Sequence, residues 1–315
     1  MKKTTLFLSI LFFVGSLSAQ SKNEFTPNLK LLQTWENAGQ TSKQHKQPYI
    51  AVYRKDGKTL IYLASDHNSG KTLDMVDYIY KKYAPEIAVV EFERTGRKLK
   101  EKCSWNEFEY SAGIASDKNI PVVLADLSYE DKVKVVLTKN SNAYKAMQAE
   151  WMIKNAISYK KQFGKNSNAE KEVHNFKIFN HNPELGKMMN TEEFKSWFKK
   201  EFDKDFDKVE LNTVFKKGWS APKSTGTIFN KLSEDEDFYG RDPFMLKNIA
   251  AALNRYDIVY AAFGEGHYRS HRKVLEDMLG KPTYIWGLKE YKDRDNCIGF
   301  KIKEEILVRP EDIGL

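Results

Sequence analysis

Residues 59–92, TLIYLASDHNSGKTLDMVDYIYKKYAPEIAVVEF, contain the pattern that decides the fold. An apolar run over 59–64 is followed by a stretch, 72–83, in which apolar side chains recur at helical spacing. A second apolar run, 87–92, comes directly after Pro85 and Glu86. The order strand, helix, strand is the unit from which parallel sheets are built. The stretch therefore predicts an α/β fold.

The flanking sequence extends this pattern in both directions. On the amino-terminal side, the apolar segment 49–53 is separated from 59–64 by a stretch that contains Asp56-Gly57, which predicts a β-hairpin. On the carboxyl-terminal side, helical and apolar segments alternate again. The predicted elements are a helix over 105–117, a strand over 120–125, helices over 243–255 and 268–279, and strands over 258–263, 283–286 and 298–302.

The chain divides into four parts by composition. Residues 20–47 are polar and predicted to be loose, and residues 48–126 and 240–315 form the α/β core. Residues 127–239 are highly charged, contain helical segments such as 191–206, and are predicted to be a mostly helical insertion or lid. The predicted fold is α/β, with a mixed, largely parallel sheet flanked by helices and two related halves, each with a strand that ends in a histidine-containing turn.

The first 19 residues have the features of a signal peptide. Lys2 and Lys3 precede an apolar run over 6–14, and small residues ending at Ala19 follow it. The run is shorter than the roughly 20 residues that a membrane-spanning helix needs, so a retained anchor is the weaker alternative. The protein is therefore predicted to be exported, to the periplasm or beyond the cell, with no stable membrane span.

Composition narrows the classes of partner. The net charge is +8, and charges of both signs alternate along the chain, so we predict no nucleic-acid binding. The oligomeric state is left open. Cys103 and Cys297 are the two cysteines, and either one disulfide or two separate thiols would fit an exported protein.

Acidic and histidine residues follow the predicted strands. His67 and His267 come after the strands 59–64 and 258–263, Glu91 and Glu93 lie at the end of 87–92, and Asp126 follows 120–125. The carboxyl ends of parallel strands are where α/β proteins bind ligands. Imidazoles and carboxylates together are ligands for a divalent metal, or an acid and a base for hydrolysis.

Individual roles follow from the expected environment. Glu91 ends a very apolar run, so its carboxylate needs a metal or an arginine as partner. The arginines Arg94 and Arg241 are candidates for binding an anion or stabilising oxyanion charge, with a structural ion pair as the alternative. The remaining candidates support the site: Asp66, Glu93, Asp126 and His271 around the ligands, and Glu265 or Glu93 as a general base.

The residues 65–72, SDHNSGKT, allow a second interpretation. They follow a strand and precede a helix, as a phosphate-binding loop does. Ser65, however, occupies the position of the first glycine of that motif, so nucleotide hydrolysis is the weaker hypothesis.

The order of these motifs resembles the erythromycin-esterase/ChaN-like superfamily, and is closest to its TraB, GumN and TIKI-type families. The resemblance is carried by the glutamate motif at Glu91 to Arg94, by Arg241-Asp242 and by the late Gly264-Glu265-Gly266-His267. The early motif departs from the family pattern, because Ala64 replaces the usual glycine before His67. Together these segments cover about a third of the chain, and the helical middle is not part of the resemblance.

The resemblance implies an active site between two related halves, and it leaves the function open because members of the superfamily differ in activity. The first hypothesis is a metal-assisted hydrolase of peptide or ester bonds, acting on a peptide or a small molecule. His67, Glu91 and His267 would hold manganese, cobalt, iron or zinc or would activate water, with Arg241 near the oxyanion. The alternatives are a ChaN-like envelope protein that binds haem or another ligand without turnover, and an inactive relative.

Overall fold

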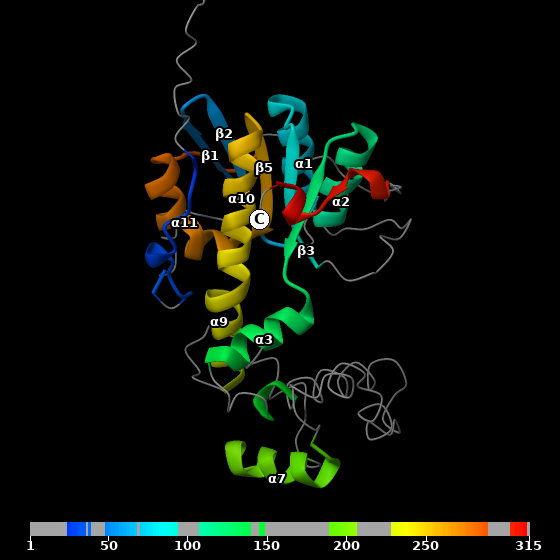
Figure 1. The fold of residues 1–315 in the computed structure, drawn as a ribbon. Helices are drawn as coiled ribbons and strands as arrows, with labels where there is room; N and C mark the ends of the chain where they lie inside the picture. Colours follow the sequence, from blue (N-terminus) through cyan, green and yellow to red (C-terminus); the bar gives the residue numbers. More distant parts are fainter. Residues whose placement is uncertain are drawn as a thin grey trace, which may run out of the picture.

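The computed structural model describes residues 24–35, 37–38, 48–67, 70–93, 107–139, 145–148, 189–206, 228–288 and 303–313. These residues build one seven-stranded sheet in the order β6-β1-β2-β5-β3-β4-β7 (Figure 1). The strands are β1 (Tyr49–Lys55), β2 (Lys58–Ser65), β3 (Ile87–Glu93), β4 (Val122–Asp126), β5 (Ile258–Gly264), β6 (Thr283–Ile285) and β7 (Leu307–Val308).

Helices connect the strands. The α-helices are α1 (Gly70–Tyr83), α2 (Glu107–Asp117), α3 (Tyr129–Lys139), α7 (Thr191–Phe202), α9 (Ile228–Glu236), α10 (Asp242–Arg255) and α11 (Glu265–Leu279). A π-helical turn, η5 (Asp237–Arg241), joins α9 to α10, and short 3-10 turns occur at η1 (Leu29–Leu31), η6 (Glu304–Ile306) and η7 (Pro310–Ile313).

The sheet is mixed and largely parallel, which confirms the predicted fold class. Strand β5 lies between β2 and β3 and is parallel to both, and β4 and β7 continue the parallel part. Only β1 runs against the other strands: it is antiparallel to both of its neighbours, β2 and β6. The predicted hairpin joins β1 to β2, and its turn uses positive φ angles of 50° at Asp56 and 78° at Gly57, as a tight hairpin turn requires.

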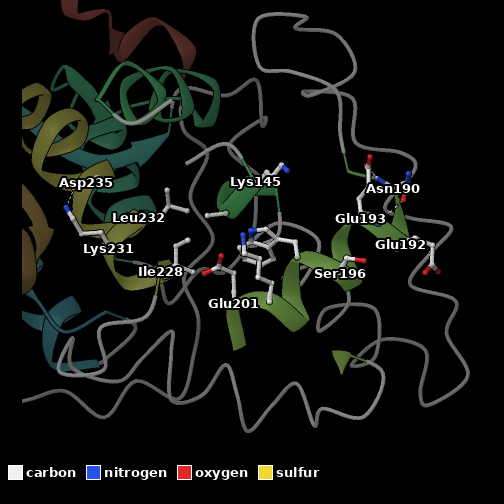
Figure 2. Close-up of a pocket in the computed structure, with 13 residues that line it drawn as sticks. Lys145, Asn190, Glu192, Glu193, Ser196, Glu201, Ile228, Lys231, Leu232 and Asp235 are labelled. Carbon is white, nitrogen blue, oxygen red and sulfur yellow. Dashed lines mark hydrogen bonds and ion pairs between the residues drawn. The ribbon is translucent and has the colours of Figure 1, made fainter. Parts of the chain in front are cut away.

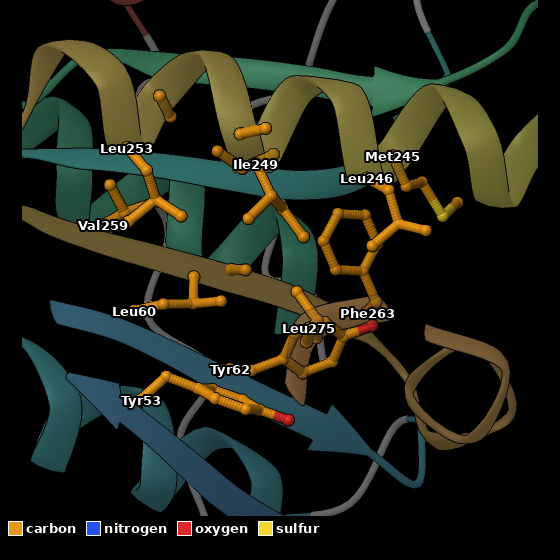
Figure 3. Packing of buried hydrophobic residues seen from close by; sticks show 14 of the residues in the cluster. Tyr53, Leu60, Tyr62, Met245, Leu246, Ile249, Leu253, Val259, Phe263 and Leu275 are labelled. Atoms are coloured by element: carbon orange, nitrogen blue, oxygen red, sulfur yellow. The ribbon is translucent and has the colours of Figure 1, made fainter. Parts of the chain in front are cut away.

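Apolar residues cover both faces of the sheet. Helices α10 and α11 pack on one face and α1 and α2 on the other (Figure 1). Along β1, Tyr49, Ala51 and Tyr53 belong to the first cluster, whereas Ile50 and Val52 belong to the second, as the two-residue period of a strand dictates. Figure 3 shows the first cluster, in which Leu253 of α10 lies near Val259 of β5. Burying each such aliphatic side chain contributes about 1.5–3 kcal/mol.

The amino-terminal segment is more ordered than its polar composition predicts. Residues 24–35 pack on the side of the sheet that α10 and α11 cover, with Phe25 and Leu32 buried in the core. The side chain of Asn254 binds both the N–H and the carbonyl of Phe25, at 2.7 and 3.0 Å. The prediction of a loose segment is therefore wrong for 24–35, because two apolar side chains and one amide fix the chain on α10.

The described parts of the predicted insertion are helical. Helix α7 begins with a capping box, in which Asn190 and Glu193 each bind the other's backbone N–H. Helix α9 continues through η5 into α10 without a break, so the composition boundary at 239/240 falls inside one helical run (Figure 1).

Several predictions fall partly or wholly outside the described residues. These are the segment 1–19, the strand 298–302, and both cysteines, Cys103 and Cys297. Among the residues that the structure describes, no helix combines the length and the apolar character that crossing a membrane requires.

Candidate metal centre

The sheet topology brings the predicted residues to one edge. Strands β2 and β5 are neighbours in register, with Ser65 opposite Gly264 at their carboxyl ends. His67 follows β2 by two residues, and His267 lies in the first turn of α11, directly after β5. Glu91 comes from β3, on the other side of β5. Two histidines and a glutamate from three adjacent parallel strands thus converge, as their positions in the sequence predicted.

His67 belongs to a half-open group that we call the exposed arm: Ser65, His67 and Glu107. The Nδ1 atom of His67 lies 2.8 Å from Glu107 Oε1, and its backbone N–H donates to Ser65 Oγ at 2.9 Å. Ser65 in turn donates to Glu107. Glu107 is 1% exposed and His67 is 49% exposed, so a buried carboxylate orients an accessible imidazole.

The backbone at His67 has a φ angle of 57°, in the left-handed region that a branched or bulky residue rarely adopts. The hydrogen bond that Glu107 accepts raises the pKa of the His67 imidazole, an effect that outweighs burial. The same interaction, together with the Ser65 hydroxyl, lowers the pKa of Glu107 against the effect of its burial. The exposed arm is therefore a strained turn that a charge-assisted hydrogen bond holds in place.

His267 belongs to the buried arm, which we define as Asp242, His267 and His271. Its Nδ1 lies 2.6 Å from Asp242 Oδ1, and its Nε2 lies 3.4 Å from Glu91 Oε1. The same Asp242 oxygen binds His271 Nε2 at 3.0 Å, and His271 Nδ1 lies 3.1 Å from the Tyr62 hydroxyl. All three members of the arm are buried.

The charges of the buried arm depend on one another. Burial alone would lower the pKa of His267, but Glu91 and Asp242 raise it well above its usual range. Burial would raise the pKa of Asp242, but the two histidines lower it to about 2. His271 has a lowered pKa, mainly because of burial, so it is the neutral imidazole of the two.

Gly264 marks the point at which the two arms meet. A Cβ atom built on Gly264 would lie 2.7 Å from Nε2 of His67 and 3.5 Å from Oε2 of Glu91. The Gly264 N–H donates to that same glutamate oxygen at 2.8 Å. A residue with a side chain could not occupy this position without displacing His67, so glycine permits the close approach of these groups.

Arg241 provides the partner that a buried Glu91 requires. Its guanidinium makes four hydrogen bonds to carboxylates: Nη2 to Glu91 Oε1 at 2.7 Å, Nε and Nη2 to Asp126 at 2.8 and 3.0 Å, and Nη1 to Asp237 at 2.8 Å. Burial would raise the pKa of Glu91, but the charges of His267 and Arg241 and the Gly264 N–H bring it far below its usual range.

Of the two roles predicted for Arg241, the geometry favours the structural ion pair. Most of its donors are engaged by Glu91, Asp126 and Asp237, so it positions carboxylates and is not free to stabilise an oxyanion. Asp126, predicted to support the site, does so through Arg241, and Lys132 also binds it at 3.1 Å. The π-helical turn η5 carries Asp237 and Arg241, and such turns often occur at functional sites.

The buried arm is itself a group that could bind a metal ion. One ligand atom from each of Asp242, His267 and His271 lies within 4.8 Å of the others. The Oδ2 atom of Asp242 is buried and has no hydrogen-bond partner among the described residues. The Oδ1 atom, by contrast, already bonds to both histidines, so a metal here would replace existing hydrogen bonds.

The other predicted residues have local partners. Asp66 accepts a hydrogen bond from the Thr72 hydroxyl at 2.6 Å, in the first turn of α1. This carboxylate lies where the alternative phosphate-loop interpretation needs an anion, which argues against that interpretation. Glu265 forms an ion pair with Arg269 at 3.1 Å, one turn along α11. The side chain of Glu93 and all of Arg94 lie outside the described residues.

Sequence reasoning missed two carboxylates, Glu107 and Asp242, which orient the two histidines. Asp242 is part of the Arg241-Asp242 pair noted in the sequence. Its position before Pro243, at the start of a predicted helix, could have identified it as a residue of the site. Glu107 had no comparable signal, because an acidic residue in the first turn of a helix is common on any solvent-exposed surface.

A separate cleft of about 810 Å³ lies between α7 and α9 (Figure 2). Its charged side chains carry both signs, including Lys145, Lys231, Glu192 and Asp235, and Lys231 pairs with Asp235. Among the residues that the structure describes, no histidine lines it. The described lining thus offers carboxylates without an imidazole, whereas the sheet edge brings both together.

The sequence matches no known family model, and no curated protein or solved structure is significantly similar to it. The function is therefore inferred from the geometry of the site.

Proposed function

We propose that this protein is an exported hydrolase that uses a divalent metal held by His67, Glu91 and His267. One observation carries the proposal: each histidine binds a buried carboxylate through Nδ1, and the other nitrogens of both imidazoles lie close to Glu91 or to the Gly264 position beside it. A carboxylate behind a histidine is the usual arrangement around a metal, because it fixes the ring and the tautomer.

The donor set fits a divalent cation. Glu107 and Asp242 can accept the Nδ1 protons, so that both imidazoles present an Nε2 lone pair to the same region. The ion pairs of the site involve five carboxylates, whereas its permanent cations are Arg241 and Lys132. Glu91, Asp126 and Asp237 pair with these two cations, and Glu107 and Asp242 pair with the histidines. The raised pKa values of His67 and His267 are the response to this excess of negative charge, which a metal ion would also balance.

The metal supplies Lewis acidity: when bound, it polarises a carbonyl and lowers the pKa of water. The chain supplies position. Glu91 is fixed by Arg241 and by the Gly264 N–H, and its very low pKa makes it a ligand and a poor general base. His67, the more exposed imidazole, marks the side from which a substrate reaches the site.

The experiment that tests the proposal is metal analysis of the purified protein and matched histidine variants. Loss of the metal in His67→Ala and His267→Ala, with retention in His271→Ala, is the expected result. Loss in His271→Ala with retention in His67→Ala would instead assign the metal to the buried arm. His174→Ala, which changes a histidine of the charged segment 127–239, serves as the control.

A hydrolase screen with peptide and ester substrates then compares the metal-loaded parent with His67→Ala. Absorption of the same samples tests the haem alternative. A Soret band that appears on adding haem and disappears in His267→Ala, without turnover in the screen, would contradict the hydrolase proposal.

A further inference from the structure

The amino-terminal segment ends at the candidate metal centre. After Phe25 is fixed to Asn254 on α10, the chain continues to α11, where the Gln33 N–H donates to the Ser270 carbonyl at 3.4 Å. Two residues later Trp35 meets the first turn of α11. The segment 24–35 therefore crosses two helices and delivers one large aromatic ring to the site.

Trp35 makes close contact with this turn. Its indole ring lies edge-on to the His267 imidazole, with the ring centroids 6.2 Å apart and the planes at 86°. A Cβ atom on Gly266 would lie 3.3 Å from the indole, so the absence of a side chain at Gly266 makes room for the ring. As a residue Trp35 is only partly buried, although its indole Nε1 atom is buried.

The other histidine has an aromatic neighbour as well. Phe108 lies edge-on to His67, with centroids 5.6 Å apart, but its side chain is almost completely buried. Of these two aromatic residues, Trp35 is the less buried. Arg241, which could otherwise bind an anionic substrate, is engaged by three carboxylates.

Resting on the proposed function, we infer that Trp35 is a specificity-determining residue, and that the substrate carries an uncharged apolar group, aromatic or aliphatic, beside the bond to be cleaved. An indole offers a large apolar face at small entropic cost, and aromatic partners gain additional stabilisation from ring-to-ring contacts. The sequence that precedes the α/β core thereby selects the substrate of a site built by the core.

The test measures how strongly the protein prefers a phenyl group over a methyl group. Benzohydroxamate and acetohydroxamate are titrated by calorimetry into the Co²⁺-loaded parent and into Trp35→Ala and Trp35→Phe. The parent is expected to prefer benzohydroxamate by about tenfold. Trp35→Ala should lose this preference while binding acetohydroxamate as the parent does, and Trp35→Phe should keep most of it.

A second experiment, on metal-free protein, separates this inference from the proposed function. Benzamide and acetamide, which lack a chelating group, are titrated into metal-free protein and followed by ligand NMR. If Co²⁺ does not bind but the parent still prefers benzamide through Trp35, the metal proposal fails and the specificity inference stands. Equal preference for phenyl in the parent and in Trp35→Ala would overturn the inference in either experiment.

A second substitution guards against misfolding of Trp35→Ala. Gly266→Ala places a methyl group against the indole and shifts the ring by a few tenths of an ångström without removing it. Its preference for benzohydroxamate is expected to fall between those of the parent and Trp35→Ala. A Gly266→Ala protein that folds and shows an unchanged preference would contradict the position assigned to the Trp35 ring.

Discussion

The two arms of the candidate metal centre use the same pairing in different surroundings. In the exposed arm, His67 occupies a strained turn, is 49% exposed and is held by one carboxylate, Glu107. In the buried arm, His267 lies in a regular helix, is 5% exposed and shares Asp242 with a second histidine. Under the proposed function, the buried arm is the rigid support, and the exposed arm is the side from which substrate reaches the metal.

The ion pairs that support the buried arm should matter most for stability. Arg241→Met leaves Glu91, Asp126 and Asp237 without their common cation in a buried environment. Removing one partner of a buried ion pair costs about 3–5 kcal/mol. We expect a loss of that size in the free energy of unfolding in urea. Arg272→Met, which breaks an exposed pair with Glu276, is the control and should change stability very little.

The carboxylates behind the histidines should separate the two arms. Replacing a residue that supports a metal-ligating histidine lowers metal affinity by about 10–100-fold. Asp242→Asn and Glu107→Gln should both do so in a competition assay with a chelator. Asp242→Asn should also reduce the free energy of unfolding by the larger amount, because two buried histidines depend on Asp242. Equal losses of stability would remove the distinction between the arms.

Gly264→Ala tests whether the arms meet where the distances indicate. The new methyl group would lie 2.7 Å from His67 Nε2, at the far end of a side chain that can rotate away. We expect about a tenfold loss of metal affinity with a change in unfolding free energy of less than about 1 kcal/mol. Gly70→Ala, at the start of α1 with no atom within 4 Å of the new methyl group, is the matched control and should bind metal normally.

The smallest expected effect is a loss of folding stability at alkaline pH, which comes from tyrosines buried in the core. Burial raises the pKa of Tyr53, Tyr80 and Tyr260 above their ordinary value of 10.0. A raised pKa in the folded state stabilises the protein fully below the unfolded pKa, and this contribution is lost as the pH rises above about 10. Stability should therefore fall above that pH. Absorption at the tyrosinate wavelength should show the buried tyrosines ionising together with unfolding, and early ionisation in the folded protein would contradict their burial.

The residues at the sheet edge could be predicted from the sequence because the end of each strand is determined by the short segment around it. Periodicity located β2, β3, β4 and β5 within a few residues, and the chemistry at their ends identified His67, Glu91 and His267. These predictions needed only the rule that parallel strands align their carboxyl ends.

The sequence could not predict the partners, because these depend on contacts between distant segments. Glu107 meets His67 across 40 residues, and Arg241 meets Glu91 across 150. The docking of residues 24–35 was missed for the same reason: the segment is polar on average, and only Phe25 and Leu32 enter the core. The continuity of α9, η5 and α10 was hidden by Pro243, which normally marks a helix start but here follows a π-helical turn.

The most direct test of the central claim is to locate the metal. Crystals of the protein soaked with Co²⁺ are measured at the cobalt absorption edge, and the anomalous difference map shows where the ion binds. The account predicts a peak between Nε2 of His67, Nε2 of His267 and the carboxylate of Glu91. A peak between Asp242 and His271, or a site that remains empty at saturating Co²⁺, would contradict it.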